Sequence, residues 1–345
     1  MGSPTPIAPG LARTDFHAAI RRNAWNTAWL CLLLAAVGLV LGYVVGWAWE
    51  VYAVGPAVPS AYPPAPQLEP WYPGNWDPSA WGLRSAAIMA VASGLAILVA
   101  LTRGDRIVLG LAGARVVSDD EAPQLHNVVE EMALAAGLPK PRVAVIDTPA
   151  LNAFATGLKP ENAAIAVTRG LLDTLDRSEL QGVVAHEMSH IGNNDILYAT
   201  AVGVLVGLIA LVSDAALRSL RFAGRGAGRG RGGRKGGGAA AIAVLVLLLF
   251  AILAPLMARL VQMAISRQRE YMADATAVKL TRNPLGLIGA LQKIGGSSVR
   301  YEGANRAIQH LFIANPLRNF GRDAGALFAT HPAVEDRIER LRDLH

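Results

Sequence analysis

Long apolar stretches without charge alternate along this chain with segments of mixed polarity. Residues 23–49, 85–102, 196–213 and 236–258 contain no charged side chain. The first and last are long enough to cross a bilayer as helices, and residues 85–102 lie at the lower limit. The pattern therefore predicts about four transmembrane helices. A cleaved signal peptide is the alternative for the first, but its apolar region would normally be shorter.

Basic residues surround the first two apolar segments unevenly. Arg21 and Arg22 precede the first segment, Arg103 and Arg106 follow the second, and the Pro/Trp-rich loop 50–80 contains no Lys or Arg. Because cytoplasmic loops are enriched in Lys and Arg, this places the N-terminus and the chain after residue 102 in the cytoplasm. The loop is expected on the opposite side of the membrane.

Residues 116–195 have the mixed pattern of a soluble α+β unit. Ser118 or Asp119 is expected to cap a helix that ends at Gly137, and Asp176 or Ser178 to cap a second helix over residues 180–191. Short β-branched and apolar runs between them predict three strands, at residues 141–147, 152–156 and 163–168. Towards the C-terminus, alternating charges predict a last helix over residues 334–344.

The second of these helices carries the sequence His-Glu-Met-Ser-His. On a helix, His186 and His190 stand one above the other on the same face, so both imidazoles can reach one metal ion. Glu187 lies between them, where a carboxylate can accept a proton from water held on the ion. This arrangement is typical of zinc hydrolases; a chance match on an amphipathic helix is the alternative.

A catalytic zinc site needs a third protein ligand. A nearby third histidine is excluded, because the positions that the longer motif gives to Gly and His hold Asn193 and Ile196. Glu270 is the best candidate on a later helix, since Asp274 one turn further could accept a hydrogen bond from a ligand histidine. From the residues alone, a carboxylate pair on a solvated helix face explains these two positions equally well.

Composition narrows the class of protein. Of 345 residues, 52% are hydrophobic and 17% charged, which favours a membrane protein over an ordinary soluble enzyme. The single cysteine, Cys31, excludes an intrachain disulfide. The basic Arg/Gly-rich tract 218–238 could bind RNA or anionic lipid, but a flexible linker with solvated charges is favoured, so no nucleic-acid partner is expected.

Four motifs in order give the chain a resemblance to the HtpX family of bacterial membrane zinc metalloproteases, in peptidase family M48, which is related to Ste24 and Oma1. They begin at Asn152, His186, Ser266 and Ala329, and read NAFATG, HEMSH, SRQREYMAD and ATHP. The resemblance implies one Zn²⁺ per chain on His186, His190 and Glu270, with Glu187 as general base.

The resemblance also implies the roles of the remaining site residues. Asp274 would hydrogen-bond a ligand histidine, and Asn152, Ala153 and Phe154 would contact the substrate backbone on an edge strand. His331 would stabilise the oxyanion, with a core or capping histidine as the alternative. The loop 50–80 and the Arg/Gly-rich tract are longer than the resemblance leads us to expect.

The expected fold class is an α+β membrane protein, mainly helical, with about four transmembrane helices and a zincin-like catalytic domain containing a small β-sheet. The expected organisation is a tail (1–22), two transmembrane helices (23–102), a first catalytic part (103–195), an apolar helix (196–217), a linker (218–238), a fourth apolar helix (239–262) and a second catalytic part (263–345). Because His190 and Glu270 must reach one ion, segments three and four both cross the membrane or both stay on the catalytic side; two crossings are favoured.

The family points to quality control and stress response at the bacterial inner membrane, with a cytoplasmic active site and misfolded or damaged membrane proteins, or unfolded polypeptides, as substrates. A CAAX-prenyl protease of the Ste24 type, a catalytically degenerate membrane adaptor and an Arg/Gly-driven nucleic-acid or lipid binder remain the alternatives.

Overall fold

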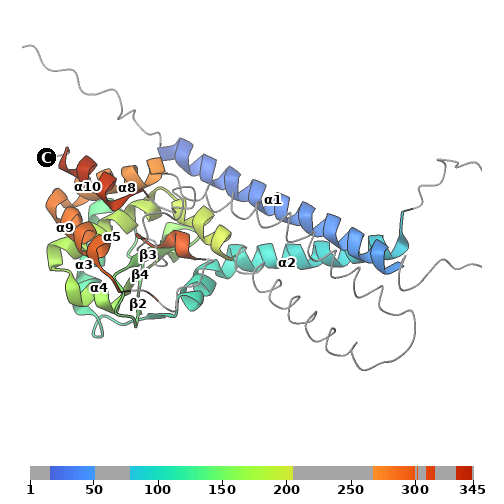
Figure 1. Cartoon of the computed structure of the whole chain (residues 1–345), viewed down its shortest axis with the longest axis horizontal. Helices are drawn as coiled ribbons and strands as arrows, with labels where there is room; N and C mark the ends of the chain where they lie inside the picture. Colours follow the sequence, from blue (N-terminus) through green and yellow to red (C-terminus); the bar gives the residue numbers. More distant parts are fainter. Residues whose placement is uncertain are drawn as a thin grey trace, which may run out of the picture. The chain divides into compact units, whose positions relative to one another are not determined.

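Two long apolar helices open the part of the chain that the computed structural model describes, which comprises residues 16–50, 78–204, 267–299, 301, 308–314 and 332–343. Helix α1 spans Phe16–Trp49 and α2 spans Ala80–Leu111 (Figure 1). By length and composition, both are able to cross a membrane. Of the third apolar segment the structure describes helix Asp195–Val204; the fourth segment and the Arg/Gly-rich tract lie outside the described residues.

Chain contacts define two compact units: one comprises residues 1–29, 100–207 and 259–345, and the other residues 30–99 and 208–258. In the second unit, α1 and α2 approach closely along three glycines spaced four residues apart, Gly38, Gly42 and Gly46. A Cβ atom on Gly42 would lie 2.6 Å from the backbone oxygen of Ser85. Small residues at this spacing let helix backbones meet in a membrane, where close packing holds helices together.

Helix α2 continues well beyond the predicted end at residue 102 and reaches Leu111. The prediction ended the helix at its first charges, Arg103 and Asp105. Asp105 is buried, however, and pairs with Arg142, and both residues belong to the first unit. A charge that finds a partner within the protein does not have to end a helix at the membrane boundary. The predicted boundary at residue 103 therefore falls inside a helix.

A four-stranded mixed sheet forms the centre of the first unit. Its strands are β1 (Ala114–Val116), β2 (Arg142–Ile146), β3 (Ala153–Thr156) and β4 (Ala164–Thr168), in the order β1-β2-β4-β3. β2 and β4 run parallel, and β1 and β3 are antiparallel to their neighbours. The three predicted strands are confirmed, β1 was missed, and β3 is an edge strand of this sheet.

The two predicted N-terminal helices of this unit are α3 (Pro123–Ala136) and α5 (Arg177–Gly192). Asp176 caps α5, because its side chain accepts a hydrogen bond from the Glu179 N–H while Glu179 accepts one from Asp176. The predicted cap of α3 was wrong: the helix begins at Pro123, which needs no N–H partner in the first turn. Gly137 ends α3 with φ 66°, as expected.

The remaining described elements are short. They comprise α4 (Arg169–Thr174), α8 (Arg267–Thr281), α9 (Pro284–Gly296), α10 (Val334–Arg342) and the 3₁₀ turns η2 (Pro160–Asn162) and η3 (Gln309–Leu311).

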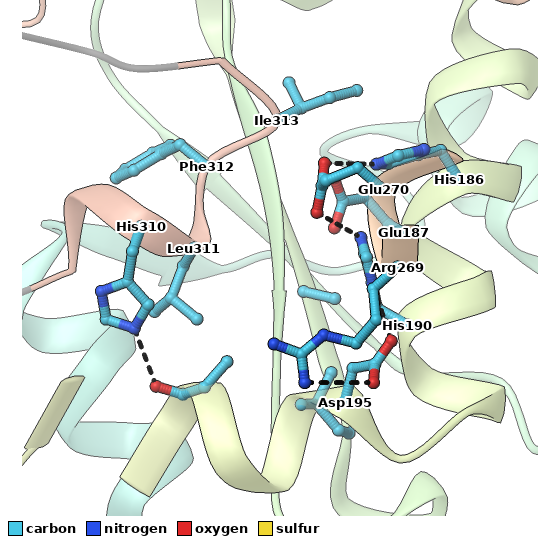
Figure 2. A pocket seen from close by; sticks show the side chains of 13 residues that line it. His186, Glu187, His190, Asp195, Arg269, Glu270, His310, Leu311, Phe312 and Ile313 are labelled. Atoms are coloured by element: carbon cyan, nitrogen blue, oxygen red, sulfur yellow. Dashed lines mark hydrogen bonds and ion pairs between the residues drawn. The ribbon is translucent and has the colours of Figure 1, made fainter. Parts of the chain in front are cut away.

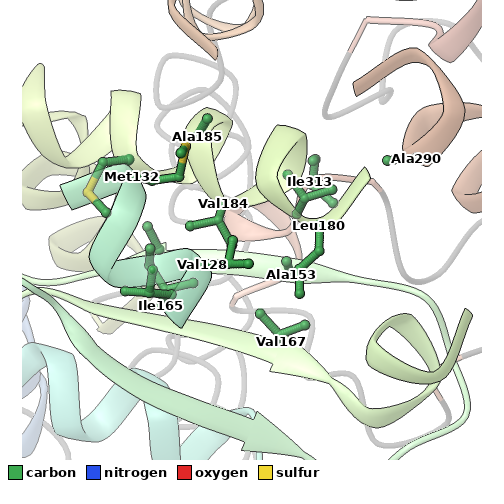
Figure 3. Packing of buried hydrophobic residues seen from close by; sticks show 14 of the residues in the cluster. Val128, Met132, Ala153, Ile165, Val167, Leu180, Val184, Ala185, Ala290 and Ile313 are labelled. Carbon is green, nitrogen blue, oxygen red and sulfur yellow. The ribbon is translucent and has the colours of Figure 1, made fainter. Parts of the chain in front are cut away.

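One apolar core joins α3 and α5 to the sheet. Figure 3 shows Val128 of α3 and Val184 of α5 close to Ile165 and Val167 of β4. Ile313, which follows η3, belongs to the same buried cluster. Because this core fixes α5 against the sheet, it also fixes the side chains of the His-Glu-Met-Ser-His motif.

The contact between α5 and α9 depends on the absence of a side chain at Gly182. A Cβ atom there would lie 2.7 Å from the backbone N of Leu287. We expect Gly182→Ala to lower the free energy of unfolding by about 1–3 kcal/mol, because α9 must shift to admit the methyl group. Gly296→Ala is the control, since a Cβ there meets nothing within 4 Å. Equal thermal stability of the two variants would contradict the close approach.

Candidate metal centre

Helix α5 presents the two motif histidines together. His186 and His190 lie one turn apart with ring centroids 4.9 Å from each other, at nearly a right angle. His186 is fully buried, whereas His190 is in part accessible. Glu187 is buried beside them and, like both histidines, lines a cavity (Figure 2).

Helix α8 brings Glu270 between the two histidines. One carboxylate oxygen of Glu270 lies 3.8 Å from Nε2 of His186, and the other lies 3.7 Å from Nε2 of His190. One ligand atom from each of the three residues falls within a group no wider than 4.8 Å. Since zinc bonds to nitrogen and oxygen are about 2 Å long, three atoms at these separations can share one ion. The donor set of two imidazoles and one carboxylate fits zinc.

Each histidine has a carboxylate on its other ring nitrogen. Nδ1 of His186 lies 2.9 Å from Asp274, and Nδ1 of His190 lies 3.2 Å from Asp195. Such contacts hold Nδ1–H as a donor and leave Nε2 free for a metal. The structure thus places Asp274 where the sequence predicted it, whereas Asp195 was missed, although a carboxylate just beyond the end of the motif helix was a usable signal.

An arginine stands behind each of these carboxylates. Arg337 of α10 donates to both oxygens of Asp274, at 2.9 and 2.6 Å, and is buried. Arg269 lies 3.9 Å from Asp195. Arg337 was also missed; it occupies the apolar face of α10 with Val334, Ile338 and Leu341, an unusual place for an arginine.

The protonation of the centre follows from burial and these charges. Burial, and secondarily Arg337, lower the pKa of His186 and favour the neutral ring that a metal requires. Burial also lowers the pKa of His190, but the hydrogen bond to Asp195 and the charge of Glu270 outweigh it and raise the pKa to about 9. Burial raises the pKa of Glu187 to about 7.

The cavity beside Glu187 reaches the edge strand. Ala155 of β3 lines it, and the backbone of Ala155 acts to lower the pKa of the Glu187 carboxyl group, against the larger effect of burial. The water-accessible space is about 40 Å³, enough for a few water molecules. Opposite the two histidines, the wall is formed by His310, Leu311, Phe312 and Ile313, as Figure 2 shows.

The predicted substrate residues lie at the start of this edge strand. Asn152 directly precedes β3, and Ala153 and Phe154 belong to it; all three are buried. The amide of Asn152 bonds to the backbone of Ala314, a contact within the chain itself. His331 lies outside the described residues, and His310, which the sequence analysis did not single out, lines the cavity.

Comparison with known proteins identifies the family of the chain. The family model "Peptidase family M48" matches residues 119–345, which include the motif helix, α8 and α10. The chain belongs to peptidase family M48. It is therefore a metalloprotease, and the helices α1 and α2 are consistent with a membrane protein.

The M48 relatives that the chain resembles are named protease HtpX homologues. One from Thermoanaerobacter pseudethanolicus is 47% identical over 264 residues, covering 76% of this chain and 86% of the relative. One from Pyrococcus furiosus is 48% identical over 243 residues, covering 70% and 80%. One from Listeria monocytogenes is 46% identical over 266 residues, covering 76% and 87%.

Among solved structures, the M48 chain is similar to Ste24p of S. mikatae, with 22% identity and a TM-score of 0.43. The match covers 74% of this chain and 57% of that one.

The two carboxylates behind the histidines should differ in their effect on stability. We expect Asp195→Asn and Asp274→Asn each to weaken zinc binding by about 10–100-fold, because each removes the charge that holds a ligand ring. Only Asp274→Asn leaves the buried Arg337 without a counter-charge, so it should cost a further 3–5 kcal/mol or so of stability. Chelator competition measures zinc affinity, and thermal unfolding measures stability. Wild-type zinc affinity in both variants would contradict this geometry.

Proposed function

We propose that the chain is a membrane-bound zinc endopeptidase with His186, His190 and Glu270 as zinc ligands. The observation that carries the proposal is the position of Glu270, on a helix 80 residues beyond the motif, between the Nε2 atoms of both histidines. A chance motif on an amphipathic helix would have no reason to collect a third ligand and a carboxylate behind each ring. Membership of a metalloprotease family supports the same site.

Within this site, Glu187 is the general base. When bound, zinc would polarise a water molecule and the carbonyl of the scissile peptide bond. Glu187 accepts a proton from the attacking water and passes it to the leaving amine as the C–N bond breaks.

Asn152, Ala153 and Phe154 are proposed to align the substrate. An extended peptide can add to the open side of an edge strand through backbone hydrogen bonds, which depend little on its sequence. Such recognition suits unfolded or damaged membrane proteins, so protein quality control under stress is the proposed role. His331 is proposed to stabilise the oxyanion of the reaction.

The proposed location is the bacterial inner membrane, with the catalytic unit on the cytoplasmic side. The Arg residues around the first two apolar segments support this orientation. We further propose that residues 196–213 and 236–258 both cross the bilayer, giving four transmembrane helices in all. Two crossings return the chain to the side of His190 before it reaches Glu270.

Removal of the general base should separate catalysis from metal binding. We expect Glu187→Gln to keep stoichiometric zinc and to lower cleavage of an unfolded polypeptide by at least about 10²-fold. Glu270→Ala should lose zinc itself, because two imidazoles alone bind it weakly. The exposed Glu130→Gln is the matched control for both losses. Retained cleavage by Glu187→Gln would refute the mechanism, and undiminished zinc in Glu270→Ala would reassign the third ligand.

The number of crossings can be tested in the Arg/Gly-rich tract. If residues 196–213 and 236–258 both span the bilayer, a cysteine replacing Gly233 should react with a membrane-impermeant thiol reagent added outside the cell. Cys31 is first replaced by Ala, and a cysteine replacing the exposed Leu134 of α3 reports the cytoplasmic side. Labelling of the Gly233→Cys variant only after lysis would show that neither segment crosses.

A further inference from the structure

The segment Ile308–Ala314 runs along the edge strand β3. At its start, Nε2 of His310 lies 3.0 Å from the backbone oxygen of Ala199. The ring of Phe312 then packs edge-on against Phe154, with centroids 5.0 Å apart. Ile313 is buried in the core cluster. The segment therefore rests on the strand that is proposed to receive the substrate.

The backbone of Ile313 and Ala314 is bound there as a peptide ligand would be. The N–H of Ile313 donates to the oxygen of Ala153 at 2.9 Å. Asn152 receives the N–H of Ala314 at 3.3 Å and donates its amide to the oxygen of Ala314 at 2.8 Å. Arg337 donates to the oxygen of Ile313 at 3.1 Å. Both N–H and both C=O groups of these two residues are satisfied by this site.

The bonded side of β3 is the side that faces the metal centre. The oxygen of Asn152 accepts from Thr168 of β4, whereas that of Ala153 points away from β4 to Ile313. Because backbone groups alternate in direction along an antiparallel strand, the backbone groups of Ala155 also turn away from β4. Ala155, Glu187 and Ile313 line the same cavity. Ile313 thus occupies the same open side of β3 as the general base, two strand residues away.

The groups that hold Ile313 also belong to the metal centre. Arg337 binds the Ile313 oxygen and also donates a hydrogen bond to Asp274. The Asp274 carboxylate in turn contacts Nδ1 of His186. The space left between the segment and the ligands holds only a few water molecules. A peptide strand therefore cannot lie on this part of β3 while Ile313 and Ala314 remain there.

We propose that Asn152, the oxygen of Ala153 and Arg337 form a substrate-backbone site, and that Ile313–Ala314 occupies this site in the resting enzyme. A substrate strand displaces the two residues, takes over their four backbone hydrogen bonds, and places an apolar side chain where Ile313 is buried. The inference rests on the proposed proteolysis. It adds Arg337 as a substrate contact, and a preference for extended segments with a branched apolar residue.

A kinetic test uses Ile313→Ala in the full-length, zinc-loaded protein in detergent. Loss of the buried side chain weakens the internal occupant and leaves its backbone in place. KM for an unfolded polypeptide should fall by about tenfold, since an occupant that competes with substrate raises the apparent dissociation constant. Ile288→Ala is the matched control: Ile288 is a buried isoleucine of the same core cluster, on α9. A KM that is unchanged or raised in Ile313→Ala, or lowered equally in both, overturns the proposal.

A binding test needs no cleavage. The probe is the capped peptide Leu-Phe-Ile-Ala, which copies residues 311–314, added to zinc-loaded Glu187→Gln protein. It should bind, and the amides of Ile313 and Ala314 should then exchange hydrogen faster, because the peptide takes their places. A peptide of the same composition in another order is the control.

Absence of binding, or unchanged exchange of these amides with the peptide bound, overturns the inference. Failure of the proposed function is distinguishable from both results: the wild-type zinc protein would then cleave no polypeptide, whatever the peptide does.

Discussion

The meeting of α5 and α8 at Glu270 is the contact on which this structure depends. Two histidines on one helix can bind a metal only when a third ligand faces them, and that ligand comes from a segment 80 residues later. The segment between His190 and Glu270 includes helix Asp195–Val204. It has to leave the site at His190 and return to it at Glu270.

Buried charge makes this contact selective. Asp274, Arg337 and His186 lie almost without solvent, where an unpaired ion would be strongly destabilising. Each finds its counterpart on a different element: His186 on α5, Asp274 on α8 and Arg337 on α10. Because the imidazole of His186 and the charges of Asp274 and Arg337 satisfy one another only when all three helices are in place, His186 is oriented by the complete unit rather than by α5 alone.

Arg337 connects the metal ligands to the edge strand as well. Its guanidinium has five donors in a rigid fork, enough to bind both oxygens of Asp274 and still reach the Ile313 carbonyl. Lysine could not make this set of bonds. The contacts that orient His186 and the site proposed to hold a substrate backbone therefore share one side chain. Arg337 thus fixes the position of a peptide bound on β3 relative to His186.

Local pattern by itself determined much of this protein. The charge-free stretches located α1 and α2, the strands β2, β3 and β4 were found within a residue or so, and the Asp176 cap and Gly137 end followed from short-range hydrogen bonds. The grouping of His186, Glu187 and His190 was predictable because it is fixed by the period of one helix. For Glu270, the residues alone left two alternatives, a metal ligand or a carboxylate on a solvated helix face. Only the resemblance of its motif to a family favoured the first.

The tertiary structure decided what depends on partners far away in sequence. Asp105 lies within α2 because Arg142 neutralises it, Arg337 looked like one more charge on an exposed helix, and Asp195 followed a motif that appeared complete without it. The burial of Ile313 on β3 could not be predicted either, since an edge strand has the same sequence pattern whether its open side is free or occupied. In each case, burial of a charge or a backbone group is stabilised by a contact that only the folded chain creates.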